Sequence, residues 1–228
     1  MAGQRWAVDL GSGNYELKGY WADGTGDGQR YSYYRKSTRG HNTLTFGGWD
    51  GRPGPSGQRV DGSRMTLISQ FHGSSTGGPK SAVVDMSWAY GHQGPTSVVR
   101  SFRWDRGMKT LTITDALGWA PATDGPDPGF PVMAAVLNLT WAMHTRAAIS
   151  ITTASVDRPS RAVLLQGGVE LVVMLLEPKG ASFTSTAVHV PPPQKATDGI
   201  FKLMVEVARA VGAEAVKVSF TVGALRVN

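Results

Sequence analysis

Apolar and polar residues alternate with a period of two along much of this chain. Four stretches show the pattern most clearly: 63–72, 80–90, 96–105 and 108–117. In the second of them, Val84, Met86 and Trp88 alternate with Asp85 and Ser87. Because successive side chains of a strand point to opposite faces, the pattern predicts antiparallel strands with one buried and one solvated face.

The alternation continues to the C-terminal end of the sequence. Seven further strands are expected, at 132–145, 147–153, 161–166, 169–176, 182–188, 200–207 and 214–222. Turns are expected at 105–107 and at Gly167-Gly168. Residues 199–211 also fit a helical stripe, and we prefer a strand because VEV and VKVSFTV are typical of neighbouring strands. About a dozen strands with little or no helix indicate an all-β fold, a large antiparallel β-sandwich.

The N-terminal fifth of the chain is less regular. Residues 4–10 alternate, with Trp6 and Val8 on one face and Asp9 on the other, and predict a first strand. Residues 11–30 are rich in glycine and predict a loop of a length that is usually functional or disordered. Residues 41–47 (HNTLTFG) alternate again and predict a strand that begins at His41.

Composition excludes several classes of protein. The 228 residues are 41% hydrophobic, enough for a substantial core, and the absence of cysteine excludes disulfides and thiolate metal ligands. We find no apolar run long enough to span a membrane and no export signal at the N-terminus. The net charge of +6 is scattered, without a nucleic-acid-binding motif, so we expect neither a nucleic-acid nor a membrane partner.

Asp9 and His41 are candidate metal ligands. Carboxylate and imidazole groups both bind zinc. Their separation of 32 residues matches no standard ligand spacing, and polar residues at strand ends are ordinarily solvated. The pattern by itself therefore leaves both interpretations open.

The text WAVDLGSGNYELKGYW, followed by RYSYYRKSTRGHNTLTF, resembles the C-terminal β-sheet domain of the heparinase II/III family of polysaccharide lyases. The later blocks VVDMSWAYG, VVRSFRWDRG, TLTITDAL, LTWAMHT and AVLLQGG are similar to its successive strands. This resemblance implies that Asp9 and His41 bind a structural zinc ion. It also implies that the third ligand, the second histidine of a His-x-His segment, lies upstream of Met1.

The resemblance places the main catalytic groups outside these residues as well. In the family, the main catalytic tyrosine lies on a preceding helical toroid, and the first histidine of the His-x-His segment also works at the active centre. The chain starts abruptly in what reads as a strand interior. We therefore expect residues 1–228 to form a single β-sandwich domain, a fragment that lacks an upstream α-toroid and the first strand of the sandwich.

Tyr15, Tyr34 and Asn42 are the candidates for contact with the substrate. The two tyrosines flank the ligand pair, and aromatic rings with polar tips stack on sugars, although the aromatic residues here could equally pack the loop onto the sheet. Contact with a uronate carboxylate is one interpretation of Arg35, Lys36 and Arg39, and we prefer a solvated basic edge. We expect His144 to be a strand residue without a metal partner.

The resemblance implies a parent protein that cleaves uronate-containing acidic polysaccharide by β-elimination, with this part inactive alone. A uronyl epimerase begins with the same proton abstraction and is a related interpretation. A non-catalytic carbohydrate-binding or scaffold module is the alternative from another class. The family also implies an exported parent, although this sequence carries no signal.

Overall fold

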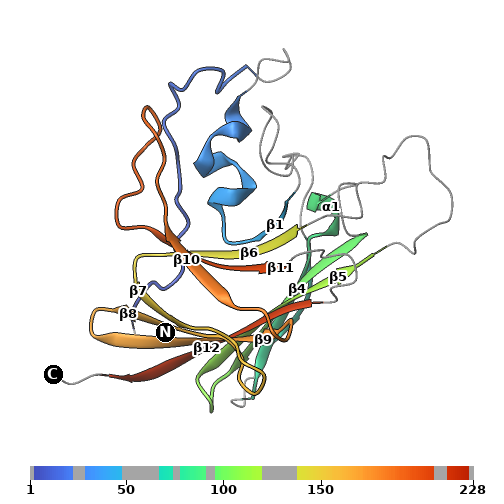
Figure 1. Cartoon of the computed structure of the whole chain (residues 1–228). Helices are drawn as coiled ribbons and strands as arrows, with labels where there is room; N and C mark the ends of the chain where they lie inside the picture. The colour runs from blue at the N-terminus through green and yellow to red at the C-terminus, as the bar shows by residue number, and fades with distance from the viewer. Residues whose placement is uncertain are drawn as a thin grey trace.

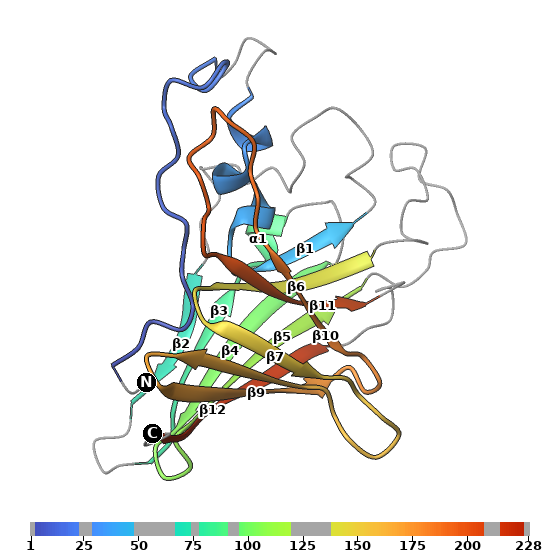
Figure 2. The same cartoon turned by 60° about the vertical axis from the view of Figure 1, so that its left-hand side comes forward.

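Two antiparallel sheets pack face to face, so the predicted all-β sandwich is confirmed (Figures 1 and 2). The computed structural model describes residues 3–22, 29–47, 67–73, 78–90, 96–119, 138–207 and 215–225. Helix in these ranges is limited to single turns: η1 Arg30–Ser32, η2 Tyr34–Lys36, η3 Thr38–Gly40 and α1 Ser87–Tyr90. None of them has the length or hydropathy of a membrane-spanning helix.

The larger sheet has eight strands in the order β2-β3-β4-β5-β12-β9-β8-β7. In chain order they are β2 Leu67–His72, β3 Lys80–Asp85, β4 Ser97–Asp105, β5 Thr110–Gly118, β7 Ala148–Thr152, β8 Arg161–Gln166, β9 Val169–Glu177 and β12 Ala215–Leu225. The turn between β8 and β9 is the predicted Gly167-Gly168 pair, whose φ values of 57° and 73° are those that a two-residue hairpin turn requires.

The smaller sheet has four strands in the order β1-β6-β11-β10. They are β1 Leu44–Gly47, β6 Asn138–Thr145, β10 Phe183–Ala187 and β11 Phe201–Val207. The strand expected within 199–211 is therefore confirmed over 201–207, whereas residues 208–211 lie outside the described part. Residues 63–66 and 132–137 of two other predicted strands also lie outside it.

The core fills the space between the two sheets. Along β9, Val169, Leu171 and Val173 are at most 4% exposed and alternate with partly exposed residues, as the period of two predicts. Trp141 of β6 faces Phe220 of β12, with ring centroids 6.4 Å apart. Burial of each such apolar side chain stabilises the fold by about 1.5–3 kcal/mol.

Residues 4–10 are extended but do not form the predicted strand. Their alternation survives, since Trp6, Val8 and Leu10 are buried. β1 pairs with β6 only as far as Leu44 opposite Trp141, which leaves the end of β6 open on that side. The Val8 amide donates to the His144 carbonyl there at 2.9 Å, so the segment reaches the sheet through a single backbone bond of this kind rather than a ladder.

The strand expected over 80–90 ends at Asp85 and gives way to helix α1. The Asp85 side chain accepts a hydrogen bond from the Ser87 amide at 2.9 Å, which turns the chain. Met86 and Tyr90 are then buried one helical turn apart, whereas Trp88 is 65% exposed. The prediction was wrong here because a short apolar run fits both periods.

A buried ion pair on the larger sheet supports the opposite layer. Arg100 and Asp115 face each other in the β4–β5 register. The Arg100 guanidinium donates to both carboxylate oxygens, at 2.6 and 2.9 Å, and the Asp115 side chain is fully buried. A third donor of Arg100 reaches the Asn42 carbonyl at 2.9 Å. The pair thus links the larger sheet to the segment that precedes β1.

Replacement of Asp115 by alanine should destabilise the protein strongly, because it leaves the Arg100 charge buried without its carboxylate. We expect a loss of about 3–5 kcal/mol in the free energy of unfolding, measured by urea denaturation. Asp157→Asn, a change in an exposed turn, is the matched control and should alter stability little. A loss below about 1 kcal/mol for Asp115→Ala, the level of exposed ion pairs, would contradict the bracing role.

Candidate functional site

The structure brings Asp9 and His41 together. His41 Nδ1 lies 2.8 Å from Asp9 Oδ2, although the residues are 32 positions apart. Both side chains are about half exposed, at 51% for Asp9 and 41% for His41. An exposed pair of this kind contributes little to stability, typically about 0–1 kcal/mol.

The local backbone fixes each member of the pair. Asp9 Oδ1 accepts a hydrogen bond from the Gly11 amide at 2.8 Å, which holds the carboxylate against its own chain. His41 follows η3, where Gly40 packs against the Tyr34 carbonyl so closely that a Cβ atom would collide with it. The backbone can therefore adopt this conformation before His41 only with glycine at position 40.

Partial burial opposes ionisation of Asp9, but hydrogen bonds from Gly11 and His41 and the electrostatic effects of His41 and His144 outweigh it. Together they hold the pKa of Asp9 below its ordinary value. The carboxylate is therefore ionised at neutral pH, as a metal ligand must be.

The pair fits two positions of a zinc site. Two donors that each lie about 2.0–2.1 Å from a tetrahedral ion are about 3.3 Å apart, so Asp9 Oδ2 and His41 Nδ1 need to separate by about half an ångström. Among the residues that the structure describes, no cluster of three or more His, Asp or Glu side chains is arranged to hold a metal. The third ligand remains a prediction.

A partly buried polar network, centred on the buried His144, lies behind the pair. The Tyr34 hydroxyl is 2.9 Å from His144 Nε2, and the Asn42 Oδ1 atom is 3.1 Å from His144 Nδ1. An amide oxygen only accepts, so His144 Nδ1 carries the proton and donates it to Asn42. His144 Nε2 is then an acceptor, and Tyr34 donates to it.

Burial, followed by the nearby charges of Lys202 and His41, lowers the pKa of His144 to about 4, against the opposing effect of Asp9. Burial likewise raises the pKa of Tyr34 to about 12, opposed by the charge of Arg39. Both groups are neutral at pH 7. The network therefore acts as a fixed hydrogen-bond chain in this structure rather than as a ready base.

Asn42 connects the segments that carry the pair. Its Oδ1 atom also accepts from the His144 backbone amide at 2.7 Å, and its Nδ2 atom donates to the Val8 carbonyl at 3.1 Å. Val8 immediately precedes Asp9, and Asn42 immediately follows His41. One amide side chain thus fixes the backbone next to both candidate ligands.

Tyr34 and Asn42, predicted as contacts of the substrate, have these internal partners. Tyr15, the third candidate, lies in a separate aromatic group: its ring stacks on Trp21 with centroids 5.8 Å apart and meets Tyr20 edge to face. No described contact joins Tyr15 to Asp9 or His41. Contact of all three residues with substrate remains a prediction.

Arg35 is buried, so its expected place on a solvated basic edge is wrong. Its guanidinium donates to the backbone carbonyls of Leu10, Lys195 and Ala196. It therefore ties η2 to the end of the N-terminal segment and to the loop before β11. Burial is the largest cause that lowers the pKa of Arg35, followed by the charge of Arg146.

Sequence reasoning placed His144 as an ordinary strand residue and missed its link to the site. It also missed Lys202, which lies opposite His144 in the β6–β11 register and is 7% exposed. The Lys202 ammonium donates to the Arg39 carbonyl at 3.0 Å, just before His41. The available signals were a histidine at the end of the apolar run Trp141–Met143 and a lysine between Phe201 and Leu203 of the neighbouring strand.

Comparison with known proteins agrees with the expected family. The family model described as "Heparinase II/III-like, C-terminal" matches residues 1–213. The chain therefore belongs to this family. No curated protein sequence matches it.

The fold is similar to those of solved lyase structures. One is heparan sulfate lyase HepC from Pedobacter heparinus, with a TM-score of 0.60 and 11% identity over 99% of this chain. A mutant of HepC matches with a TM-score of 0.58 and 12% identity over 96% of this chain. A heparinase III, the BT4657 gene product, matches with a TM-score of 0.56 and 12% identity over 96% of this chain. This chain covers 30%, 29% and 28% of those chains, respectively.

His144 should make the stability of the protein depend on pH. Between pH 6.5 and about 4 the unfolded chain binds a proton at this residue and the folded protein does not, so stability falls as the pH falls through this range. The loss should reach about 3 kcal/mol in urea denaturation.

His144→Gln should flatten this pH dependence, because glutamine does not titrate. His189→Gln, a change at an exposed histidine, is the control and should leave the dependence intact. Identical pH profiles for His144→Gln and the unchanged protein would show that the pKa of His144 is the same in the folded and unfolded states.

Proposed function

We propose that this chain is the C-terminal β-sandwich part of a polysaccharide lyase that cleaves uronate-containing chains by β-elimination, with Asp9 and His41 as two ligands of a structural zinc ion. Membership of the heparinase II/III-like family and the fold shared with heparan sulfate lyases support the general assignment. The substrate, the metal and the dependence on an upstream toroid are the finer parts of the proposal.

One observation carries it: the convergence of Asp9 and His41 at 2.8 Å. The pair is about half exposed and contributes little to stability, yet the partly buried Asn42 side chain fixes the backbone beside both of its members. Such bracing is what a metal ligand requires, since neighbouring hydrogen bonds fix the orientation of ligating side chains.

Zinc bound through side chains alone, with no open coordination position, would be structural. In this proposal Asp9 Oδ2 and His41 Nδ1 hold it, and the chain's own residues do the positioning. Asn42 fixes the backbone beside each ligand, and Tyr34 holds His144 in the tautomer that donates to Asn42. The face that meets the toroid would thereby keep one shape.

β-Elimination needs three things: neutralisation of the uronate carboxylate, removal of the neighbouring proton and protonation of the leaving oxygen. Tyrosine and histidine suit the last two when their pKa values are near the working pH. Tyr34 and His144, with pKa values of about 12 and about 4, are far from it. This supports placing the proton-transfer groups outside this chain.

The first test is zinc content. After dialysis, the isolated chain should retain less than one zinc per molecule, because two ligands hold the ion weakly, and His41→Ala should retain less still. Binding should weaken at acid pH, because a ligating nitrogen must be free of its proton. Metal analysis measures both, with His72→Ala, at an exposed histidine on β2, as the control.

Equal zinc in the unchanged protein and His41→Ala would remove His41 from the site. A parent protein that carries the His-x-His segment should bind one zinc per chain, and its His41→Ala variant should lose it. Absence of zinc from that parent would overturn the metal assignment.

The second test is cleavage. We expect no unsaturated uronate absorbance when this chain alone is incubated with alginate, heparan or chondroitin chains, because the proposed catalytic tyrosine lies on the toroid. The parent protein with its toroid should produce that absorbance with at least one of them. Robust cleavage by the isolated chain would contradict the placement of the catalytic tyrosine.

A non-catalytic carbohydrate-binding module is the second candidate, and the group around Trp21 favours it. Trp21 is 65% and Tyr15 48% exposed, their rings are stacked, and the Arg30 guanidinium lies 5.0 Å from the Trp21 ring centroid. Exposed aromatic faces of this kind stack on sugar rings. An upstream reading frame that encodes a His-x-His strand after a long helical region distinguishes the lyase from this candidate.

A further inference from the structure

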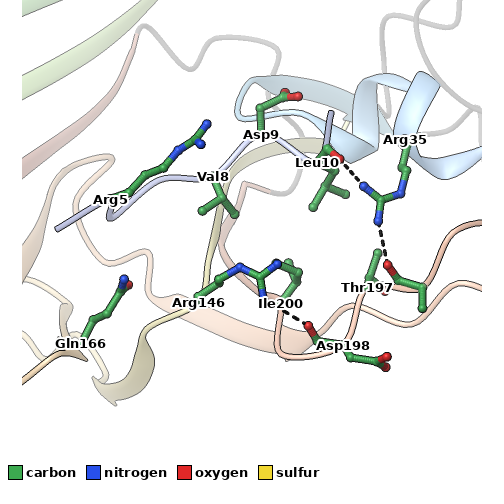
Figure 3. Close-up of a pocket in the computed structure, with 11 residues that line it drawn as sticks. Arg5, Val8, Asp9, Leu10, Arg35, Arg146, Gln166, Thr197, Asp198 and Ile200 are labelled. Atoms are coloured by element: carbon green, nitrogen blue, oxygen red, sulfur yellow. Dashed lines mark hydrogen bonds between the residues drawn. The ribbon is translucent and has the colours of Figure 1, made fainter. Parts of the chain in front are cut away.

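A small cavity opens beside the candidate ligand pair. It has a volume of about 240 Å³ and lies between the N-terminal segment, the end of β6 and the loop before β11 (Figure 3). Its lining includes Arg5, Arg35, Arg146, Gln166, Val8 and Ile200. The cavity is smaller than the roughly 300–1,000 Å³ of drug-sized ligand sites, so its occupant must be small.

Three arginines make the cavity basic. Arg35 is fixed in the wall by backbone carbonyls, including that of Ala196 at 2.7 Å. Within the described ranges, Arg146 makes one long hydrogen bond, 3.4 Å to the Asp198 carbonyl, so most of its guanidinium donors have no partner among these residues. The Arg5 side chain is exposed and has no ion-pair or hydrogen-bond partner in the described part of the chain.

The acidic residues in the lining offset these charges only in part: Asp9 raises the pKa of Arg35, against the lowering by burial and by Arg146. Asp9 is already bound to His41 and Gly11. Figure 3 shows the carboxylates of Asp9 and Asp198 directed away from the space between Arg5 and Arg146. Arg146 is close enough to Arg35 to lower its pKa, after the larger effect of burial. Like charges held this close favour an anion between them.

The side chain of Gln166 needs a hydrogen-bond donor, which an inorganic anion such as sulfate does not supply. Its Oε1 atom is buried without a hydrogen-bond partner, while its Nε2 atom contacts Gln4 at 3.4 Å. Figure 3 shows this amide directed toward the space between Arg5 and Arg146. A buried acceptor without a partner is costly, and a hydroxyl group would satisfy it.

We propose that this cavity binds a single uronate residue, with its carboxylate on Arg5 and Arg146 and a hydroxyl donated to Gln166. The lining of the cavity is the basis for a small anion with a hydroxyl group as the ligand. The identification of this anion as a sugar of the polysaccharide rests on the proposed function. On that basis the cavity holds one acidic sugar of the chain beside the zinc-ligand pair.

The test is titration of the isolated chain with glucuronate, glucose and inorganic sulfate, followed by calorimetry or by amide shifts in NMR. Glucuronate should bind saturably and glucose should not, because glucose lacks the charge. Arg146→Gln should weaken glucuronate binding about tenfold, the effect of losing a charged hydrogen bond. Arg103→Gln, at an exposed arginine on β4, is the matched control and should bind as the unchanged chain does.

Gln166→Leu separates a sugar site from a simple anion site. It should weaken glucuronate binding and leave sulfate binding unchanged. Equal binding of glucose, equal loss in Arg103→Gln, or no saturable glucuronate binding would overturn the proposal. Sulfate binding as tight as that of glucuronate, with no effect of Gln166→Leu, would reduce the cavity to an anion site and overturn the sugar assignment.

These outcomes are independent of the proposed function. The titration uses this chain alone and needs neither zinc nor cleavage. If the parent protein has no lyase activity, saturable glucuronate binding by this chain would still support the cavity proposal. If the parent is active and this chain does not bind glucuronate, only the cavity proposal is overturned. Circular dichroism and thermal unfolding of each variant show that lost binding is not lost folding.

Discussion

The arrangement of the candidate site depends on the hydrogen bonds of one residue, Asn42. Its amide oxygen accepts from the backbone and the ring of His144 on β6, and its amide nitrogen donates to Val8 in the N-terminal segment. Its backbone carbonyl accepts from Arg100 of the larger sheet. The larger sheet, the smaller sheet and the N-terminal segment are therefore all hydrogen-bonded to Asn42.

This arrangement separates the groups that give stability from those available for chemistry. The Asp9–His41 pair is about half exposed, so water screens it and it adds little to folding. His144, Asp115 and Lys202 are buried, where an unpaired polar group is expensive. The buried groups hold the backbone, and the side chains of the pair remain about half exposed to solvent. Such a division is typical of metal ligands supported by a second layer of hydrogen bonds.

The outer face of the smaller sheet shows why sequence pattern alone missed part of the site. Alternation predicts one buried and one solvated face. His144 and Lys202 lie on adjacent strands, yet both are buried. Tyr34 of η2 contacts the His144 ring, and the Arg39 carbonyl of η3 binds Lys202. Burial on that face is set by a covering segment distant in sequence, which no local period encodes.

The sequence by itself determined the strands, the hairpin glycines and the family, because period-two alternation and turn chemistry are local properties. The resemblance also named Asp9 and His41 as partners. Tertiary structure decided that residues 4–10 join the sheet by one bond, that Asp85 starts a helix, and that Arg35 faces backbone carbonyls. It also created the basic cavity from residues as distant as Arg5, Arg146 and Gln166. Contacts of this kind depend on which segments pack together, and the free energy that selects them is distributed over the whole core.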